Sequence, residues 1–230
     1  PRLRLKSARE FGKCLPTLDV TVCETRLLAP TLEKVSSMLS TFDLEQDLAA
    51  VVELLVCVCS SAGVSDTLRG DAQRMIHVTV GRMLDAFQPT FLPHFASVLQ
   101  SPAHDALAND THVSERLTLL ATDVIPSHLG NEGVSEKDAV SFYTAYLQAM
   151  PALDEVWQAL FRATLESPSS TLPMLVRVAQ AAGHRLPGAH VLEGWRLSTL
   201  VQLESEPRAW LPLLDAPAWL QSRDIELRLI

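Results

Sequence analysis

The chain has 230 residues, of which 47% are hydrophobic, and a formal net charge of −8. This apolar content is enough to bury a large core, so the composition excludes a disordered chain. The first thirteen residues hold five Lys or Arg and one acid, which leaves 14 bases and 26 acids for the rest. Proteins bind nucleic acids through clustered Lys and Arg side chains. The acidic excess after residue 13 therefore argues against a nucleic-acid surface and favours a protein partner with a basic surface.

All four cysteines lie in the first quarter of the chain, and two of them form the motif Cys57-x-Cys59 inside an apolar run. Side chains two residues apart on a helix point about 200° apart, so we expect buried packing and no shared metal. No secretory signal precedes the cysteines, which predicts an intracellular protein, cytoplasmic or nuclear. The apolar run is short and contains Glu53. We therefore predict no membrane span.

Hydrophobic spacing is helical along nearly the whole chain. Ser65 and Ser135 are placed to cap helix starts, and Gly63, Gly130 and Gly183 to end helices in a left-handed conformation. In chain order, the expected helices cover residues 3–14, 16–28, 30–41, 43–61, 66–87, 89–100, 112–128, 135–149, 151–166, 169–182 and 189–205, with a further pair at 207–215 and 217–229.

A Leu-Pro pair followed by an apolar residue recurs inside three of these expected helices. It occurs as FLPHF, TLPML and WLPLL, at residues 91–95, 171–175 and 210–214. Pro93 and Pro173 are 80 residues apart, and Pro173 and Pro212 are 39 apart. Pro16, which also follows a leucine, lies 77 residues before Pro93, and Glu53 is near the midpoint of that interval. From Glu53, ELLVCVCSSAG aligns without gaps on the PMLVRVAQAAG that begins at Pro173. The spacing predicts a repeat of about 40 residues, in which internal prolines kink successive helices and Glu53 takes the place of one proline.

The segment FLPHFASVLQSP, followed after a loop by VSERLTLLA, resembles a HEAT repeat. In that pattern a first helix with an internal Leu-Pro ends at an Asp-Pro-like turn, and a second helix opens with Val-Arg. TLESP at 164–168 and LLDAP at 213–217 show the same turn type. The resemblance to HEAT and armadillo proteins implies an all-α fold, an α-solenoid of about five to six antiparallel helix pairs in a right-handed superhelical stack. Since such stacks are open-ended, we predict one helical-repeat domain over residues 1–230, a fragment of a longer solenoid.

The sequence contains no GxxxxGK[ST], GxGxxG, GxSxG or HExxH motif. We therefore predict a non-catalytic scaffold or adaptor segment within a larger protein, with a protein partner, no cofactor and no small-molecule substrate. Helix phase places the contact face on the second helix of each pair. All four tryptophans lie in the last third of the chain; tryptophan is favoured at binding hot spots, although packing between helices is the simpler interpretation. The predicted contact residues are Glu155, Arg162, Glu193, Arg196 and Trp195.

The alternative is a helical-bundle enzyme or a ligand-binding domain with one of two polar sites. Glu53 interrupts an apolar helix face, and a buried carboxylate can serve as a general acid. A position at the rim, or an ion pair with Arg74 or Arg82 of the next helix, is the simpler interpretation. His104 and His112 lie in PAHDALANDTH, which carries zinc-ligand types, although Asp, Asn and Thr also serve turns and caps.

Overall fold

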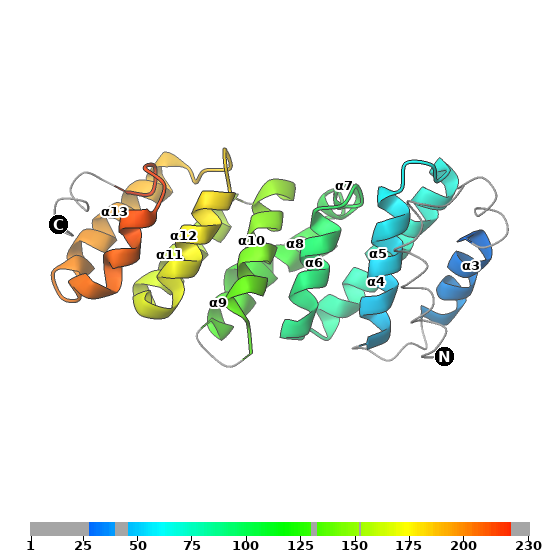
Figure 1. Ribbon diagram of the computed structural model, residues 1–230, viewed down its shortest axis with the longest axis horizontal. Coiled ribbons are helices and arrows are strands. Elements are labelled where there is room, and N and C mark those ends of the chain that lie inside the picture. The colour runs from blue at the N-terminus through cyan, green and yellow to red at the C-terminus, as the bar shows by residue number, and fades with distance from the viewer. Residues whose placement is uncertain (1–27, 40–45, 130–132, 152, 222–230) are drawn as a thin grey trace. The chain divides into compact units, whose positions relative to one another are not determined.

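A computed structural model describes residues 28–39, 46–129, 133–151 and 153–221. All regular structure in these ranges is helical, and they contain no β-strand. This confirms the all-α prediction, while the helices expected at 3–14 and 16–27 lie outside the described residues. The chain divides into two compact units, unit 1 over Pro1–Ser114 and unit 2 over Glu115–Ile230 (Figure 1).

The helices of unit 1 follow the predicted segments closely. They are α3 (Ala29–Met38), α4 (Gln46–Ser60), α5 (Asp66–Asp85), the 3-10 turn η4 (Pro89–Phe91), α6 (Leu92–Leu99), α7 (His104–Ala108) and the first part of α8 (Thr111–Leu119). Helix α4 buries residues on most of its circumference because it contacts both α5 and α6. Helix α7 forms where the sequence predicted a loop.

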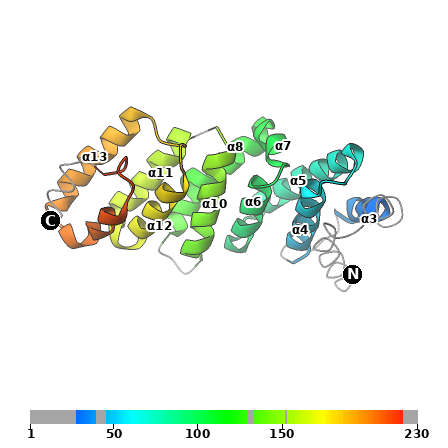
Figure 2. The same ribbon diagram turned by 45° about the horizontal axis from the view of Figure 1, so that its top comes forward.

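Unit 2 continues the pattern of helices in contact with near neighbours in the chain, which Figure 2 shows from α10 to α13. Its elements after α8 are the π-helical stretch η5 (Leu120–Val124), α9 (Ile125–His128), α10 (Glu136–Ala149), α11 (Leu153–Glu166), α12 (Pro168–Ala181), α13 (Ala189–Leu203) and the 3-10 helix η6 (Pro207–Asp215). The α-helix expected at 207–215 is thus a 3-10 helix. Residues 218–220 form a turn, and most of the helix expected at 217–229 lies outside the described residues.

Local signals located several helix ends correctly. Ser65 and Ser135 precede α5 and α10, and the Ser135 hydroxyl accepts the backbone N–H of Asp138 at 3.1 Å. Gly183 follows α12 with a φ of 61°, the left-handed conformation that glycine adopts without strain. Gly63 does not share this conformation, so that prediction was wrong. Gly130 lies outside the described residues.

The three Leu-Pro prolines occupy different places in their helices. Pro173 lies inside α12, as predicted. Pro93 lies in the first turn of α6, directly after η4, and Pro212 lies inside the 3-10 helix η6. A first-turn residue needs no partner for its amide, so Pro93 starts an α-helix and does not kink one. Among the three, Pro173 is the one that interrupts an α-helix.

The π-helical stretch η5 is followed by a further proline, Pro126, in the first turn of α9. The N–H of Ile125 donates to the carbonyl of Leu120, five residues back. In that register the next residue would donate to the carbonyl of Ala121, but proline has no N–H. The hydroxyl of Tyr143, on α10, donates to this carbonyl at 2.8 Å, and both residues are fully buried. Tyr143 therefore supplies the hydrogen bond that Pro126 cannot make.

Burial raises the pKa of Tyr143 well above its usual range, so its hydroxyl remains a donor at all physiological pH values.

Within the described ranges, no helix combines the length and apolar content that crossing a membrane requires.

Tyr143→Phe should lower the free energy of unfolding by about 1–3 kcal/mol, because it leaves a buried carbonyl without a donor. Urea unfolding followed by circular dichroism would measure the change. Tyr146→Phe is the matched control, since its hydroxyl contacts the side-chain hydroxyl of half-buried Thr118 at 2.7 Å and no backbone carbonyl loses its donor. Equal losses in the two variants would contradict the role given to Tyr143.

Candidate functional site

Helices α11 and α13 lie side by side in unit 2 and run in the same direction (Figure 2). Three contacts join them at their beginnings, middles and ends: Gly188 N–H to Oδ1 of Asp154 at 2.7 Å, the ring centroids of Trp195 and Phe161 at 4.6 Å, and Nε2 of Gln202 to the carbonyl of Leu165 at 3.0 Å. The parallel alignment fixes which faces of the two helices are turned outward together.

The tryptophans of unit 2 pack internally. Trp195 stacks on Phe161 with an interplanar angle of 18° and lies 5.6 Å from Trp210 between ring centroids. Trp157 meets Trp219 edge to face at 5.4 Å. Trp195 is only 2% exposed, which agrees with the packing interpretation of the tryptophans and leaves no surface for the contact role that was also considered. An aromatic residue in an amphipathic helix serves a core or an interface equally well, and only the position of α11 decides between them.

The other predicted contact residues have two different environments. Glu155 and Arg162 on α11 and Glu193 on α13 are exposed, so they are available to a partner. Arg196 is half-buried, and its Nη2 donates to the carbonyls of Trp219 at 2.9 Å and Gln221 at 3.1 Å. It therefore anchors the segment after η6. The use of any of these residues by a partner stays a prediction.

Sequence reasoning missed the exposed apolar side chains of α13. Leu197 and Val201 are 59% and 72% exposed, although they stand one turn apart in a helix whose other face is buried. The available signal was that apolar residues surround α13 on every side, which a helix with a single buried face does not need. Further exposed apolar side chains in this part of unit 2 are Leu186, Leu211 and Leu214.

Glu53 is half-buried on α4, and its Oε1 lies 3.9 Å from Nδ1 of His94 on α6. The predicted arginine partners both make contacts elsewhere. Arg74 pairs with Asp71 on its own helix, and Arg82 donates to the carbonyl of Leu39. The histidine that follows Pro93 therefore lies beside this carboxylate.

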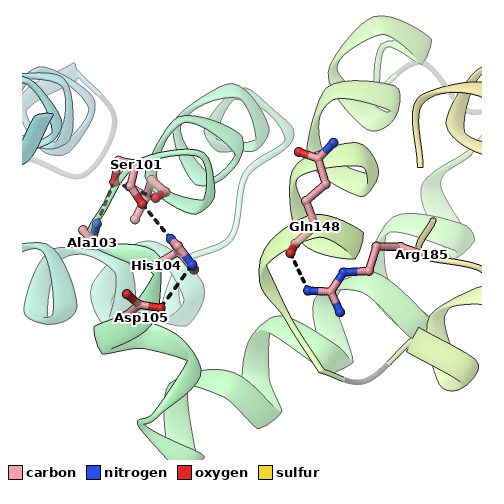
Figure 3. Close-up of polar contacts among 7 residues, drawn as sticks. Ser101, Ala103, His104, Asp105, Gln148 and Arg185 are labelled. Carbon is pink, nitrogen blue, oxygen red and sulfur yellow. Dashed lines mark hydrogen bonds and ion pairs between the residues drawn. The ribbon is translucent and has the colours of Figure 1, made fainter. Parts of the chain in front are cut away.

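The polar segment that contains His104 and His112 closes turns and caps a helix. Nδ1 of His104 lies 2.9 Å from the carbonyl of Ser101, and its Nε2 lies 3.2 Å from Oδ1 of Asp105 (Figure 3). Asp110 precedes α8 and accepts the N–H of Val113 at 2.9 Å. His112 is exposed. Over the part of the chain that the structure describes, no three His, Cys, Asp or Glu gather in a way that could hold a metal ion.

A groove of about 630 Å³ lies between α3 and α5 in unit 1. Its lining is mixed, with apolar residues beside the Asp71 and Arg74 ion pair. The lining residues are Ala29, Leu32, Glu33, Ser36, Ser37, Leu39, Leu68, Asp71, Arg74, Met75 and Val78. No sequence signal predicted this groove, because its two sides are far apart in the chain.

Of the two cysteines in the Cys57-x-Cys59 motif, Cys59 shows the buried packing that the sequence predicted. Cys59 is buried, and burial raises the pKa of its thiol to about 11. A thiol with this pKa is protonated at neutral pH and is a poor nucleophile. Cys59 is therefore a packing residue, whereas Cys57 is half-buried.

No family model, no curated protein and no solved structure matches the chain. The resemblance to HEAT repeats therefore stays a prediction, carried by the residues and contacts of this chain alone.

Asp154→Ala should lower the free energy of unfolding by about 1–2 kcal/mol, because it removes the charge-assisted hydrogen bond that joins the beginnings of α11 and α13. Glu155→Ala removes a neighbouring carboxylate from the same helix turn and is the matched control, with an expected change within about 0.5 kcal/mol. Chemical unfolding would compare the two. The role of Asp154 would be refuted by equal effects.

Asp110 should make stability depend on pH in the acid range. The N–H of Val113 is the main cause that holds the pKa of this carboxyl below its ordinary value of 3.8, and contact with His77 adds to it. A lowered pKa in the folded state stabilises the fold above the unfolded pKa, and that contribution is lost as pH falls through the folded pKa. The stability difference between the natural protein and Asp110→Asn should therefore shrink between about pH 5 and pH 2. Thermal unfolding across this range would measure it, and a constant difference would contradict the prediction.

Proposed function

We propose that this chain is a non-catalytic protein-interaction segment built from HEAT-like helical repeats. In this proposal successive helices of one layer stack in parallel, and their outward faces bind a protein partner. The chain serves as a scaffold or adaptor segment within a larger protein.

The spacing of the contacts carries the proposal. A group of side-chain hydrogen bonds inside the two units joins residues 33 to 43 positions apart: His77 with Asp110, Asp154 with Gly188, Gln180 with Asp215, Gln148 with Arg185 (Figure 3), Leu165 with Gln202, and Arg82 with Leu39. In a stack of helix pairs, a residue meets its equivalent one repeat further along. The separations therefore support a repeat of the length that the prolines predict.

Contacts between the predicted equivalent helices give independent support. Helix α4 contacts α6, and α12 contacts η6, which are the helices that hold consecutive positions of the predicted repeat. Glu53 and Pro93 are two of those positions, and Glu53 lies beside His94, the residue after Pro93. Glu53 thus meets a residue 41 positions further along the chain, on the next helix of the same predicted layer.

The chemistry of the candidate residues favours binding over catalysis. His104 and Asp110, the sharpest polar candidates, close a turn and cap a helix through ordinary hydrogen bonds. The outward residues of α11 include Glu155, Arg162 and Glu166, all exposed. Exposed charges of this kind steer and orient a protein partner more readily than they activate a substrate.

The test is chemical cross-linking with mass spectrometry on the natural protein in its own cells. We expect a protein partner recovered in near-stoichiometric amount, with cross-links close to the outward side chains of α11. The double variant Glu155→Lys, Arg162→Glu should weaken recovery. A double variant of equal net charge change, Glu33→Lys, Arg177→Glu, is the control. Recovery of a bound small molecule without any protein partner would overturn the proposal and favour the alternative, a ligand-binding domain.

A further inference from the structure

Three outward residues of α13 and its C-cap residue, Glu204, form one stripe along the helix. Glu193, Leu197, Val201 and Glu204 follow one another at steps of four, four and three residues, and all four are exposed. Such steps place side chains on one helix face. The stripe therefore consists of an apolar pair with a carboxylate at each end.

The rest of α13 keeps this stripe turned outward. Trp195 and Thr199 are buried on the opposite side, and Trp195 stacks on α11. Arg196 lies on the flank of the helix, where it holds the backbone after η6. Its Nη1 is 3.9 Å from Glu193, a long contact that leaves the glutamate side chain 63% exposed.

The stripe fits an amphipathic helix with basic ends. A partner helix binds a groove or a helix face with apolar residues spaced three or four positions apart, which is also the spacing of Leu197 and Val201. Lysine or arginine one turn beyond each apolar residue would meet Glu193 and Glu204. The charge at the two ends then selects a basic helix and rejects an acidic one.

A second copy of this chain fits the stripe poorly. In a two-fold symmetric contact each patch meets itself, so Glu193 and Glu204 of one copy would face the same carboxylates of the other. The chain also has a net charge of −8, which adds long-range repulsion between copies.

We propose that the α13 stripe docks a basic amphipathic helix of a partner protein, laid along Leu197 and Val201 with its Lys or Arg residues against Glu193 and Glu204. This inference rests on the proposed function, because it names the partner chemistry and the place where it binds.

The probe is a fluorescent peptide of about 20 residues made of leucine and lysine, with the leucines spaced to form one helix face. Two further peptides serve as controls: one of the same composition in scrambled order, and one with glutamate in place of lysine. Fluorescence anisotropy with the chain of 230 residues should show binding of the amphipathic basic peptide at least about tenfold tighter than of either control.

Variants locate the binding. Leu197→Asp and Val201→Asp should each weaken binding about tenfold or more. Leu119→Asp is the matched control, because Leu119 is an exposed leucine on α8 at 53% exposure and gains the same charge. All three side chains are exposed, so circular dichroism should show unchanged folding.

A second pair of variants tests the charges. The double variant Glu193→Lys, Glu204→Lys should lose affinity for the lysine peptide and bind the glutamate peptide more tightly than the natural protein does. Glu33→Lys with Glu115→Lys changes the net charge equally at other exposed positions and should leave the preference for lysine in place.

Three outcomes would overturn the inference. The first is an equal effect of Leu197→Asp and Leu119→Asp, which would place binding elsewhere. The second is a dimer in sedimentation that Leu197→Asp dissociates, which would make a second copy the occupant. The third is a tenfold gain in peptide affinity when the chain ends at residue 221, which would make residues 222–230 the occupant.

The proposed function can survive this failure. If the natural protein and Leu197→Asp recover the same cellular partner in equal amount, the interaction segment stands and only the α13 stripe is refuted. If neither recovers a protein partner, both proposals fail.

Discussion

The stack of Trp195 on Phe161 determines what unit 2 can present to a partner. Leu197 and Val201 follow Trp195 by two and six residues, which places them about 200° and 240° further around the helix. Once the indole faces α11, these two side chains must face away from it. The hydrogen bonds at Gly188 and Gln202 hold both ends of α13 against α11, so the helix cannot rotate to bury them. The exposed apolar pair is thus a consequence of how α13 is anchored.

Prolines impose a second constraint on the helices. A proline inside a helix has no N–H, so a carbonyl one turn back needs another hydrogen-bond donor. Pro93 avoids the requirement by standing in a first turn, where no donor is needed. Pro126 cannot avoid it, and the register widens to a π-helical stretch whose open carbonyl, that of Ala121, receives the hydroxyl of Tyr143. The N–H that Pro126 lacks is therefore replaced by the hydroxyl of Tyr143 on the next helix, α10.

Sequence reasoning succeeded where the signal is local. The helical run at 111–128 was predicted as 112–128, and α10 was predicted within one residue, because hydrophobic spacing and the Ser135 cap are properties of adjacent residues. It failed where an element depends on its surroundings. Helix α7 is short and lies in a segment rich in turn formers, and Gly63 follows α4 without the left-handed conformation that Gly183 adopts after α12.

The candidate site divides in the same way. Glu155, Arg162 and Glu193 were predicted to be exposed, and they are, because charged side chains on an amphipathic helix point away from the apolar stripe. Trp195 was a candidate contact residue and is buried, as the packing interpretation of the tryptophans expected, while Leu197 and Val201 were not singled out and are exposed. On α13 both faces carry apolar residues, so residue type could not tell which face would be covered.

The sequence by itself determined that the described part of the chain is all-α and where most of its helices begin and end. These features depend on caps, periodicity and turn chemistry, which act over a few residues. Only the tertiary structure decided which face of α13 is buried, that Arg196 anchors the backbone, and that Glu53 meets His94. Each of these depends on a neighbouring segment that lies 23 to 41 positions away in the chain, and burial is a property of that neighbour as much as of the residue itself.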